Sequence, residues 1–267
     1  MSDRSLTSID RLAMAQSLLA TRDAGATLDV TLTDEYDLSL DLAYDVQREV
    51  TLLRLARGER IVGWKLGYTS IAMRVQMGVE APNMGPLTDA MLLSEPASDG
   101  VAELPGSALQ PRVEPEIAMR LAAPLEPGCT PAEVLAACEG AYACLEVVDS
   151  LWTGYRFRLE DNTADGSSAG WVVLGGALPL ADLPTERVTL LVNGFEVAAA
   201  SGAAAGGDPA IGVAWVAGET VRRYGRRLEA GDVVISGGLT AAHALTPGGT
   251  IEARFGSGIR VSVSRPA

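Results

Sequence analysis

The strongest constraint on the fold is a series of short apolar runs that begins at Ile61 and continues to the end of the sequence. Glycine and proline separate these runs, and short runs bounded by turn residues are typical of strands. We predict strands at 61–66, 113–121, 145–148, 171–174, 188–192, 233–236, 251–255 and 259–263. Two helices should interrupt them, because a capping box at 130–133 carries proline at the first helical position and Asp208-Pro209 repeats this arrangement.

The first 60 residues show helical periodicity instead. Long or apolar side chains recur at helical spacing at Ile9, Leu12, Gln16 and Leu19. A second helix should begin after an N-cap at Ser39 and end before Gly58. Its apolar stripe consists of Leu42, Ala43, Val46, Val50 and Leu53. We therefore predict an α+β protein with a helical part at 1–60 and a β-rich catalytic domain at 61–267.

The formal net charge of the chain is −13 and its pI is near 4.5. Binding to nucleic acid without sequence preference needs a surface rich in lysine and arginine, so this class of protein is excluded. No run approaches the roughly 18 apolar residues of a membrane-spanning helix. Met1 to Leu12 mixes charges where a signal peptide has an apolar core. We expect a cytoplasmic protein with neither a nucleic-acid nor a membrane partner.

Three cysteines, Cys129, Cys138 and Cys144, fall within one short segment. Their spacing does not match the CxxC pairs of a zinc site, and their odd number does not suit a disulfide framework. We expect reduced, buried small side chains. The alternative is a catalytic thiol, which would need the sole histidine, His243, as its partner.

The most informative segment for function runs from Pro111 to Leu121. Residues two apart in a strand point to the same face, so Glu114 and Glu116 are expected side by side. Adjacent carboxylates repel unless a cation or a shared proton compensates, so the pair indicates half of a metal site or a carboxylate dyad. Pro115 cannot donate to a strand ladder, which predicts an edge strand or a bulge.

Glu146 stands in a second apolar run, and a buried glutamate is rare unless it is paired or ligated. With Glu114 and Glu116 it would form an all-oxygen site suited to Mg²⁺ or Mn²⁺. The alternative is that these acids lie on solvated faces of edge strands. Lys65, in the apolar run ahead of Gly67, could bind a carboxylate or transfer a proton, or it could be a surface lysine.

Taken together, several motifs resemble the bacterial 2-oxo-acid hydratases and decarboxylases of aromatic meta-cleavage pathways, which are related to fumarylacetoacetate hydrolase. The resemblance extends from about Ala43 to near the C-terminus. Its motifs are Gly63-Trp64-Lys65-Leu66-Gly67, Met77-Gly78-Val79, Leu87-Thr88-Asp89, Pro111 to Glu116, Glu146-Val147-Val148-Asp149-Ser150, Ala164-Asp165 and Gly231-Asp232-Val233-Val234. The second motif and Gly237 to Ala242 look more like 4-oxalocrotonate decarboxylases than 2-hydroxypentadienoate hydratases.

The resemblance implies a mixed, β-rich fold that holds Mg²⁺ or Mn²⁺. The implied metal ligands are Glu114, Glu116 and Glu146. It also implies that Lys65 fixes or protonates the oxo-acid end of the substrate, and that Asp89 orients Lys65 or relays a proton. The positions expected to border the substrate are Lys65, Leu151, Ser168 and Thr240. The implied reaction is decarboxylation of a 2-oxo acid like 2-oxo-3-hexenedioate, in which the metal acts as a Lewis acid for an enolate.

The sequence departs from the family pattern near these motifs. Leu151 replaces an arginine that usually follows the Asp-Ser pair, and Gly166 replaces an asparagine after the Ala-Asp pair. Met84, Pro115 and Asp208 also differ from the usual residues. These changes spare the implied metal ligands. They put the substrate in question, because an arginine near a pocket for a dianion is a bidentate partner.

Three other functions compete with the decarboxylase. A 2-hydroxypenta-2,4-dienoate hydratase would use the same enolate chemistry without release of CO₂. An acylpyruvate or fumarylacetoacetate hydrolase would need a histidine to activate water, and only His243 is present. The third is a divergent member with a biosynthetic substrate or a non-catalytic partner role. The resemblance also implies a homo-oligomer, with a complex with a pathway hydratase or decarboxylase as a further possibility.

Overall fold

The computed structural model describes residues 7–70, 74, 79–93 and 100–267. The helices are α1 (Ser8–Asp23), α2 (Leu32–Glu35), α3 (Leu40–Ala56), α5 (Pro131–Ala137), α6 (Leu159–Ala164) and α7 (Pro209–Tyr224). The strands are β1 (Ile61–Gly67), β2 (Asn83–Thr88), β3 (Leu92–Leu93), β4 (Ala102–Glu103), β5 (Arg112–Leu121), β6 (Cys138–Val148), β7 (Ala169–Leu178), β8 (Arg187–Val192), β9 (Phe195–Ser201), β10 (Val233–Ile235), β11 (His243–Ala244), β12 (Thr250–Phe255) and β13 (Arg260–Ser264).

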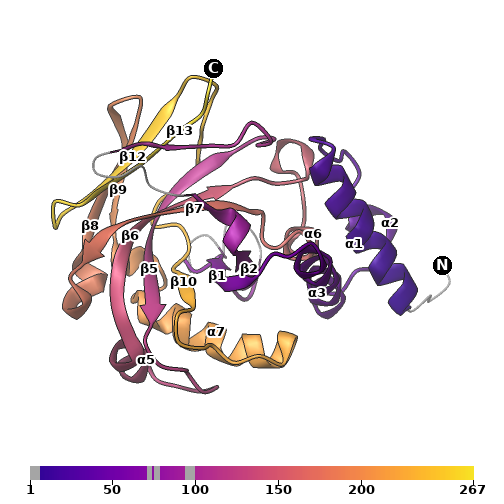
Figure 1. Ribbon diagram of the computed structural model, residues 1–267, viewed down its shortest axis with the longest axis horizontal. Coiled ribbons are helices and arrows are strands. Elements are labelled where there is room, and N and C mark those ends of the chain that lie inside the picture. Colours follow the sequence, from indigo (N-terminus) through magenta and orange to yellow (C-terminus); the bar gives the residue numbers. More distant parts are fainter. Residues whose placement is uncertain (1–6, 71–73, 75–78, 94–99) are drawn as a thin grey trace.

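The strands form two sheets. The larger sheet has eight strands in the order β2-β1-β10-β5-β6-β7-β3, with β11 paired to β5, and the smaller has five in the order β4-β13-β12-β8-β9. Strands β12 and β13 pack against β6 and β7, and α5 and α7 lie together at the bottom of the view in Figure 1. Buried side chains of both helices, such as Val134 and Val213, belong to the same core as the smaller sheet. The main hydrophobic core includes Ile117, Leu145, Leu190 and Ile251, so it joins both sheets.

The predicted helix boundaries in the first 60 residues are close to those of α1 and α3. The Ser39 hydroxyl accepts a hydrogen bond from the N–H of Leu42, which confirms the predicted N-cap. Helices α1 and α3 pack against each other beside the larger sheet (Figure 1). Their buried side chains share one cluster with Leu151, Trp152 and Ala164. The α+β prediction is confirmed, whereas the domain boundary at residue 60 remains a prediction.

Of the four residues at helical spacing, only Leu19 is buried in α1. Ile9 is 78% exposed and Leu12 is 38% exposed. The side chains that pack inward are Met14, Ala15, Leu18 and Leu19. The predicted helix is present, but spacing alone does not fix the rotation of a short helix, and packing against α3 selects the buried face.

Pro115 does not lie in an edge strand. Strand β5 is flanked by β6 on one side and by β10 and β11 on the other. The Pro115 carbonyl accepts a hydrogen bond from the N–H of Leu239 at 2.9 Å, in the segment between β10 and β11. In an antiparallel strand the nitrogen and the carbonyl of one residue point to the same neighbour. The N–H that Pro115 lacks would therefore point toward the gap between β10 and β11, where no strand needs it.

Of the three cysteines, only Cys144 is buried, and Cys129 and Cys138 are half-buried. All three are free thiols, as expected. The expectation that they are buried is wrong for Cys129 and Cys138. Burial, followed by the nearby Glu116 and Glu146, raises the pKa of Cys144 well above its ordinary value. A thiol held in the protonated form is a poor nucleophile, which argues against the catalytic alternative.

In the described part of the chain, no helix is both long enough and apolar enough to cross a membrane.

The close contact between β1 and β10 gives a prediction for stability. A Cβ atom at Gly63 would lie 1.9 Å from the Val233 carbonyl oxygen. We expect Gly63→Ala to lower the free energy of unfolding by about 1–3 kcal/mol through overpacking. Gly218→Ala is the control, because a Cβ there meets nothing within 4 Å and lies in α7. It should stabilise by about 0.5–1 kcal/mol. Equal midpoints in urea unfolding would contradict the prediction.

Candidate metal centre

The larger sheet brings the three predicted acids together. Glu114 and Glu116 lie two residues apart on β5, and Glu114 pairs in register with Glu146 of β6. One carboxylate oxygen from each of these residues lies within 4.8 Å of the others. Glu116 and Glu146 are fully buried in central strands. The alternative of solvated acids on edge strands is therefore wrong.

Lys65 completes this cluster from β1, which is separated from β5 by β10. Its Nζ lies 2.9 Å from Oε1 of Glu146. The same ammonium donates a hydrogen bond of 2.9 Å to the Ser167 carbonyl. The residue is 3% exposed, so the alternative of a surface lysine is wrong. The cluster thus contains three carboxylates and one ammonium in a buried environment.

The charges in this cluster shift one another's pKa values. Burial, followed by the charge of Glu146, raises the pKa of Glu114 to about 7. Burial and the other two glutamates raise the pKa of Glu116 well above its ordinary value. Burial is the largest effect on Lys65 and lowers its pKa, but the three glutamates together outweigh burial and raise it. Lys65 is therefore a cation near neutral pH, while the acids are incompletely compensated.

Two carboxylate oxygens in the cluster have no hydrogen-bond donor. Oε1 of Glu116 and Oε2 of Glu146 are buried and accept no hydrogen bond within the described residues. Oε2 of Glu116 accepts one from the N–H of Gly237 at 2.9 Å. A buried anionic oxygen without a partner is costly, and a hard cation with oxygen ligands would relieve this cost. The donor set therefore fits Mg²⁺ or Mn²⁺.

A tight turn at Gly166, Ser167 and Ser168 presents the carbonyl that Lys65 binds. All three residues have left-handed backbones, with φ of 70°, 59° and 55°. A Cβ at Gly85 would lie 2.0 Å from the Gly166 carbonyl oxygen, so only glycine lets β2 approach the turn this closely. The Ser167 hydroxyl donates to the side chain of Asn83 at 2.9 Å, which holds the turn against β2. We call residues 166–168 the left-handed turn.

A cavity of about 460 Å³ opens beside the cluster. Its polar lining includes Lys65, Glu114, Arg112, Asn162 and Ser168. The Arg112 guanidinium stacks 4.0 Å from the centre of the Tyr155 ring. Within the described residues no carboxylate pairs with Arg112, so its donors remain available to a ligand.

Sequence reasoning missed Arg112, Tyr155 and Asn162 as residues of this cavity. A signal for Arg112 existed, because it precedes Glu114 by two positions and must share its face of the strand. Tyr155 and Asn162 lie after β6, at the end of a short 3-10 helix (Thr153–Tyr155) and in α6. No periodicity in the sequence places such residues beside a strand.

The structure brings two of the four positions expected to border the substrate to this cavity. Lys65 and Ser168 line it. Thr240 does not, although Gly238 and Ala241 do. The Met77-Gly78 part of a quoted motif lies outside the described residues.

Asp89 is not brought to the cluster. Lys65 pairs with Gly85, whereas Thr88, which precedes Asp89, pairs with Ile61 at the other end of β1. The Asp89 carboxylate accepts hydrogen bonds from the backbone and side chain of Arg60, at 2.9 and 3.0 Å. These contacts hold the pKa of Asp89 below its ordinary value. The structure therefore gives Asp89 no contact through which it could orient Lys65.

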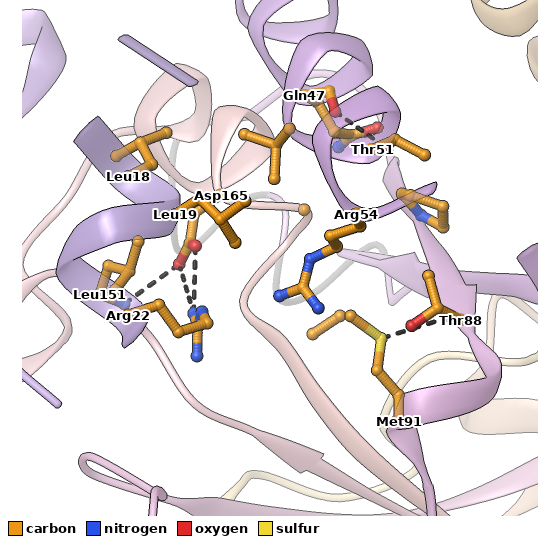
Figure 2. A pocket seen from close by; sticks show the side chains of 14 residues that line it. Leu18, Leu19, Arg22, Gln47, Thr51, Arg54, Thr88, Met91, Leu151 and Asp165 are labelled. Atoms are coloured by element: carbon orange, nitrogen blue, oxygen red, sulfur yellow. Dashed lines mark hydrogen bonds and ion pairs between the residues drawn. The ribbon is translucent and has the colours of Figure 1, made fainter. Parts of the chain in front are cut away.

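Leu151 also lies away from the cavity. It is 1% exposed and packs in the cluster formed with the N-terminal helices. Figure 2 shows Leu151 beside Asp165 and Arg22, around a separate small cavity of about 30 Å³. The expectation that Leu151 borders the substrate does not match this placement. Leu151 replaces an arginine of the family pattern, but the larger cavity still has cationic side chains, because Lys65 and Arg112 line it.

His243, the histidine that a hydrolase would need, lies in β11 opposite Val113. It is half-exposed and does not belong to the group of acids that could hold a metal.

Comparisons with known proteins agree with this architecture. The family model "Fumarylacetoacetate (FAA) hydrolase C-terminal" matches residues 60–263. A 4-oxalocrotonate decarboxylase from Pseudomonas sp. (strain CF600) is 37% identical over 262 residues, which cover 95% of this chain and 96% of the relative. A 2-hydroxypent-2,4-dienoate hydratase from Pseudomonas putida is 39% identical over 194 residues, covering 71% and 86%.

The solved structure of 4-oxalocrotonate decarboxylase from Pseudomonas putida G7, complexed with magnesium and adipate, is similar over nearly the whole fold. Its TM-score is 0.91 at 33% identity, and the match covers 98% of this chain and 100% of that chain. The chain therefore belongs to the fumarylacetoacetate hydrolase family, in the group that contains the 4-oxalocrotonate decarboxylases and the 2-hydroxydienoate hydratases.

Proposed function

We propose that this chain is a divalent-metal-dependent lyase that decarboxylates a 2-oxo acid like 2-oxo-3-hexenedioate. The observation that carries the proposal is the cluster of three glutamates, incompletely neutralised by Lys65, which reaches a cavity through Glu114 and Lys65. The decarboxylases named above match the chain over almost its full length, and the relative of known structure binds magnesium. A hydratase is the second candidate, favoured by 39% identity to a hydratase.

Glu114, Glu116 and Glu146 are the residues that would hold the metal. Their two donorless oxygens and their excess negative charge support this assignment. A divalent cation bound there would supply Lewis-acid stabilisation for the negative charge that develops on the 2-oxo group. Three protein ligands would leave positions free for the carboxylate and the oxo oxygen of a substrate.

Lys65 would bind the anionic end of the 2-oxo acid. It is fixed between Glu146 and the Ser167 carbonyl, and it is protonated at neutral pH, so it acts as a donor and a positive charge rather than as a base. Asn162 and Ser168 add polar groups to the same wall. An ammonium held in a dry site stabilises developing negative charge without reorganisation.

Arg112 supports a substrate with two carboxylates. Its guanidinium lines the cavity, stacks on Tyr155 and has no carboxylate partner within the described residues. A planar guanidinium is well suited to bidentate binding of a carboxylate. A diacid bound by its oxo-acid end at the glutamate cluster would carry its second carboxylate toward this side of the cavity. This feature favours the decarboxylase over a hydratase, whose substrate has one carboxylate.

In the proposed reaction the substrate's bond between its carbon chain and its second carboxyl group breaks, and CO₂ leaves. The electron pair of that bond moves through the unsaturated chain to the 2-oxo oxygen, beside the positive charge of Lys65. Protonation of oxygen or carbon then gives the product.

Several expectations from the sequence remain proposals. They are the cytoplasmic location, assembly into a homo-oligomer and a complex with a pathway hydratase or decarboxylase. The hydrolase alternative has less support, because His243 is not part of the glutamate cluster.

Metal binding should depend on pH. At pH 6 Glu114, with a pKa of about 7, holds a proton that a metal must displace, and at pH 8 this carboxylate is ionised. A raised carboxyl pKa also makes the metal-free fold less stable as pH rises from about 4.5 to 7. Both effects predict a larger rise of Tm on addition of Mn²⁺ at pH 8 than at pH 6. Glu116→Gln should abolish most of this rise, whereas Glu103→Gln, an exposed control, should keep it. A rise that is equal in all three proteins would contradict the metal site.

Turnover should require both the metal and Lys65. With Mg²⁺ the chain should release CO₂ from 2-oxo-3-hexenedioate, and EDTA should abolish the activity. Lys65→Met should lower kcat/KM by about 10²–10³-fold, because a preorganised donor is lost. Assays with 2-hydroxypenta-2,4-dienoate and simple acylpyruvates test the hydratase and the hydrolase. Activity that survives EDTA, or a Lys65→Met variant with full turnover, would refute the mechanism.

Arg112 should discriminate between diacids and monoacids. Arg112→Gln should raise KM for 2-oxo-3-hexenedioate by about 10–100-fold, the effect of losing one charge-assisted pair. Competitive inhibition by a 2-oxo monoacid should not change. Arg156→Gln removes the same charge from an exposed side chain of the neighbouring segment and should leave both constants unchanged. An equal loss for diacid and monoacid would show that Arg112 does not read the second carboxylate.

A further inference from the structure

We infer that Arg22 of the N-terminal helix α1 is a positioning residue for the catalytic cavity, acting through Asp149 and Asp165. The inference rests on the proposed function for its activity assays. Arg22 does not line the cavity, and its side chain is only 16% exposed. It reaches two acids that follow β6 and α6, the elements that carry Glu146 and Asn162. The three groups come from segments far apart in the sequence.

The contacts of Arg22 are those of a clamp. Its Nη2 donates to the Asp149 carbonyl at 2.8 Å and to Oδ1 of Asp165 at 3.1 Å. Its Nη1 donates to Oδ2 of Asp149 at 3.4 Å. Figure 2 shows the guanidinium directed at Asp165. A planar guanidinium can serve two acceptors at once, which a lysine ammonium at this position could not do with the same geometry.

Asp165 connects this clamp to the left-handed turn. It directly precedes Gly166, and its Oδ2 accepts the N–H of Leu151 at 3.1 Å. Two residues further on, the Ser167 carbonyl accepts the hydrogen bond from Lys65. The backbone of the turn is in a region that L-residues seldom adopt, so it persists only where its surroundings fix it. Arg22 supplies one of the fixed points.

Asp149 connects the clamp to the strands of the glutamate cluster. Its carboxylate accepts the N–H groups of Leu109 and Gln110, at 3.1 and 2.8 Å, just before β5 begins. Its own N–H donates to the Ser168 carbonyl at 2.8 Å. Without Arg22, the buried carboxylates of Asp149 and Asp165 would each lose their ion-pair partner. We therefore expect the turn to shift rather than the β5–β6 ladder, which is held by its own hydrogen bonds.

The test compares Arg22→Met with Met14→Ala at a temperature where both are folded. Met14 is buried in α1 within the same hydrophobic cluster, and its truncation weakens the packing of the helix without removing the clamp. We expect Arg22→Met to lower kcat/KM by about 30-fold or more, as a misplaced catalytic group does. Mn²⁺ affinity should stay within about threefold of the original chain, and Met14→Ala should keep kcat/KM within the same margin.

Three further variants test the route by which Arg22 acts. If Arg22 acts through Asp165, the double variant Arg22→Met/Asp165→Asn should be no more than about threefold worse than Asp165→Asn alone. Should Arg22→Met fail to fold, Arg22→Lys, which keeps the charge but loses the fork, should still lower kcat/KM by about fivefold or more. Multiplicative losses in the double variant, or full activity of either Arg22 variant, would overturn the inference.

A binding assay separates this inference from the proposed function. Calorimetric binding of pyruvate in the presence of Mg²⁺ probes the cavity without turnover. Arg22→Met should weaken pyruvate binding by about tenfold, a loss of about 1.4 kcal/mol. If the original chain does not decarboxylate any diacid but shows this loss, the proposed function fails and the positioning role stands. Unchanged pyruvate binding, or Mn²⁺ affinity that falls in parallel, would overturn the positioning role.

Discussion

The contact between the Lys65 ammonium and the buried glutamates governs most of what surrounds the site. Carboxylates in the centre of a sheet are costly unless cations face them, and one lysine cannot neutralise three acids. The remaining negative charge makes the cluster selective for a small multivalent cation. Burial also restricts the conformation of the neighbouring backbone, because buried donors and acceptors near the cluster need hydrogen-bond partners at particular positions.

Glycine and left-handed backbone meet this requirement. Gly85 allows the left-handed turn to approach β2, and Gly238 leaves room for the carboxyl group of Glu114, which a Cβ would meet at 2.7 Å. These residues contribute no chemistry of their own. They let polar backbone and carboxylates come together at distances that larger residues would prevent. The geometry of the site therefore depends on these glycines as well as on the charged residues.

The sequence predicted the parts of the site that depend on one strand at a time. The spacing of Glu114 and Glu116 fixed their common face, and the polar residue in the apolar run at Glu146 marked the second strand. Relations that depend on tertiary packing were beyond it. The family resemblance implied that Asp89 lies near Lys65, yet the register of β1 and β2 separates them. Leu151 was assigned to the substrate, and it packs under α1 instead.

The clamp made by Arg22 has a consequence for how the chain matures. Its two ends, Arg22 and Asp165, are separated by 143 positions. The ribosome therefore adds Asp165 long after the helix that carries Arg22. Contacts between such distant residues form late in folding, since the loop between them must close first. Docking of α1 should therefore follow formation of the larger sheet. The geometry of the cavity would be complete only after this late docking step.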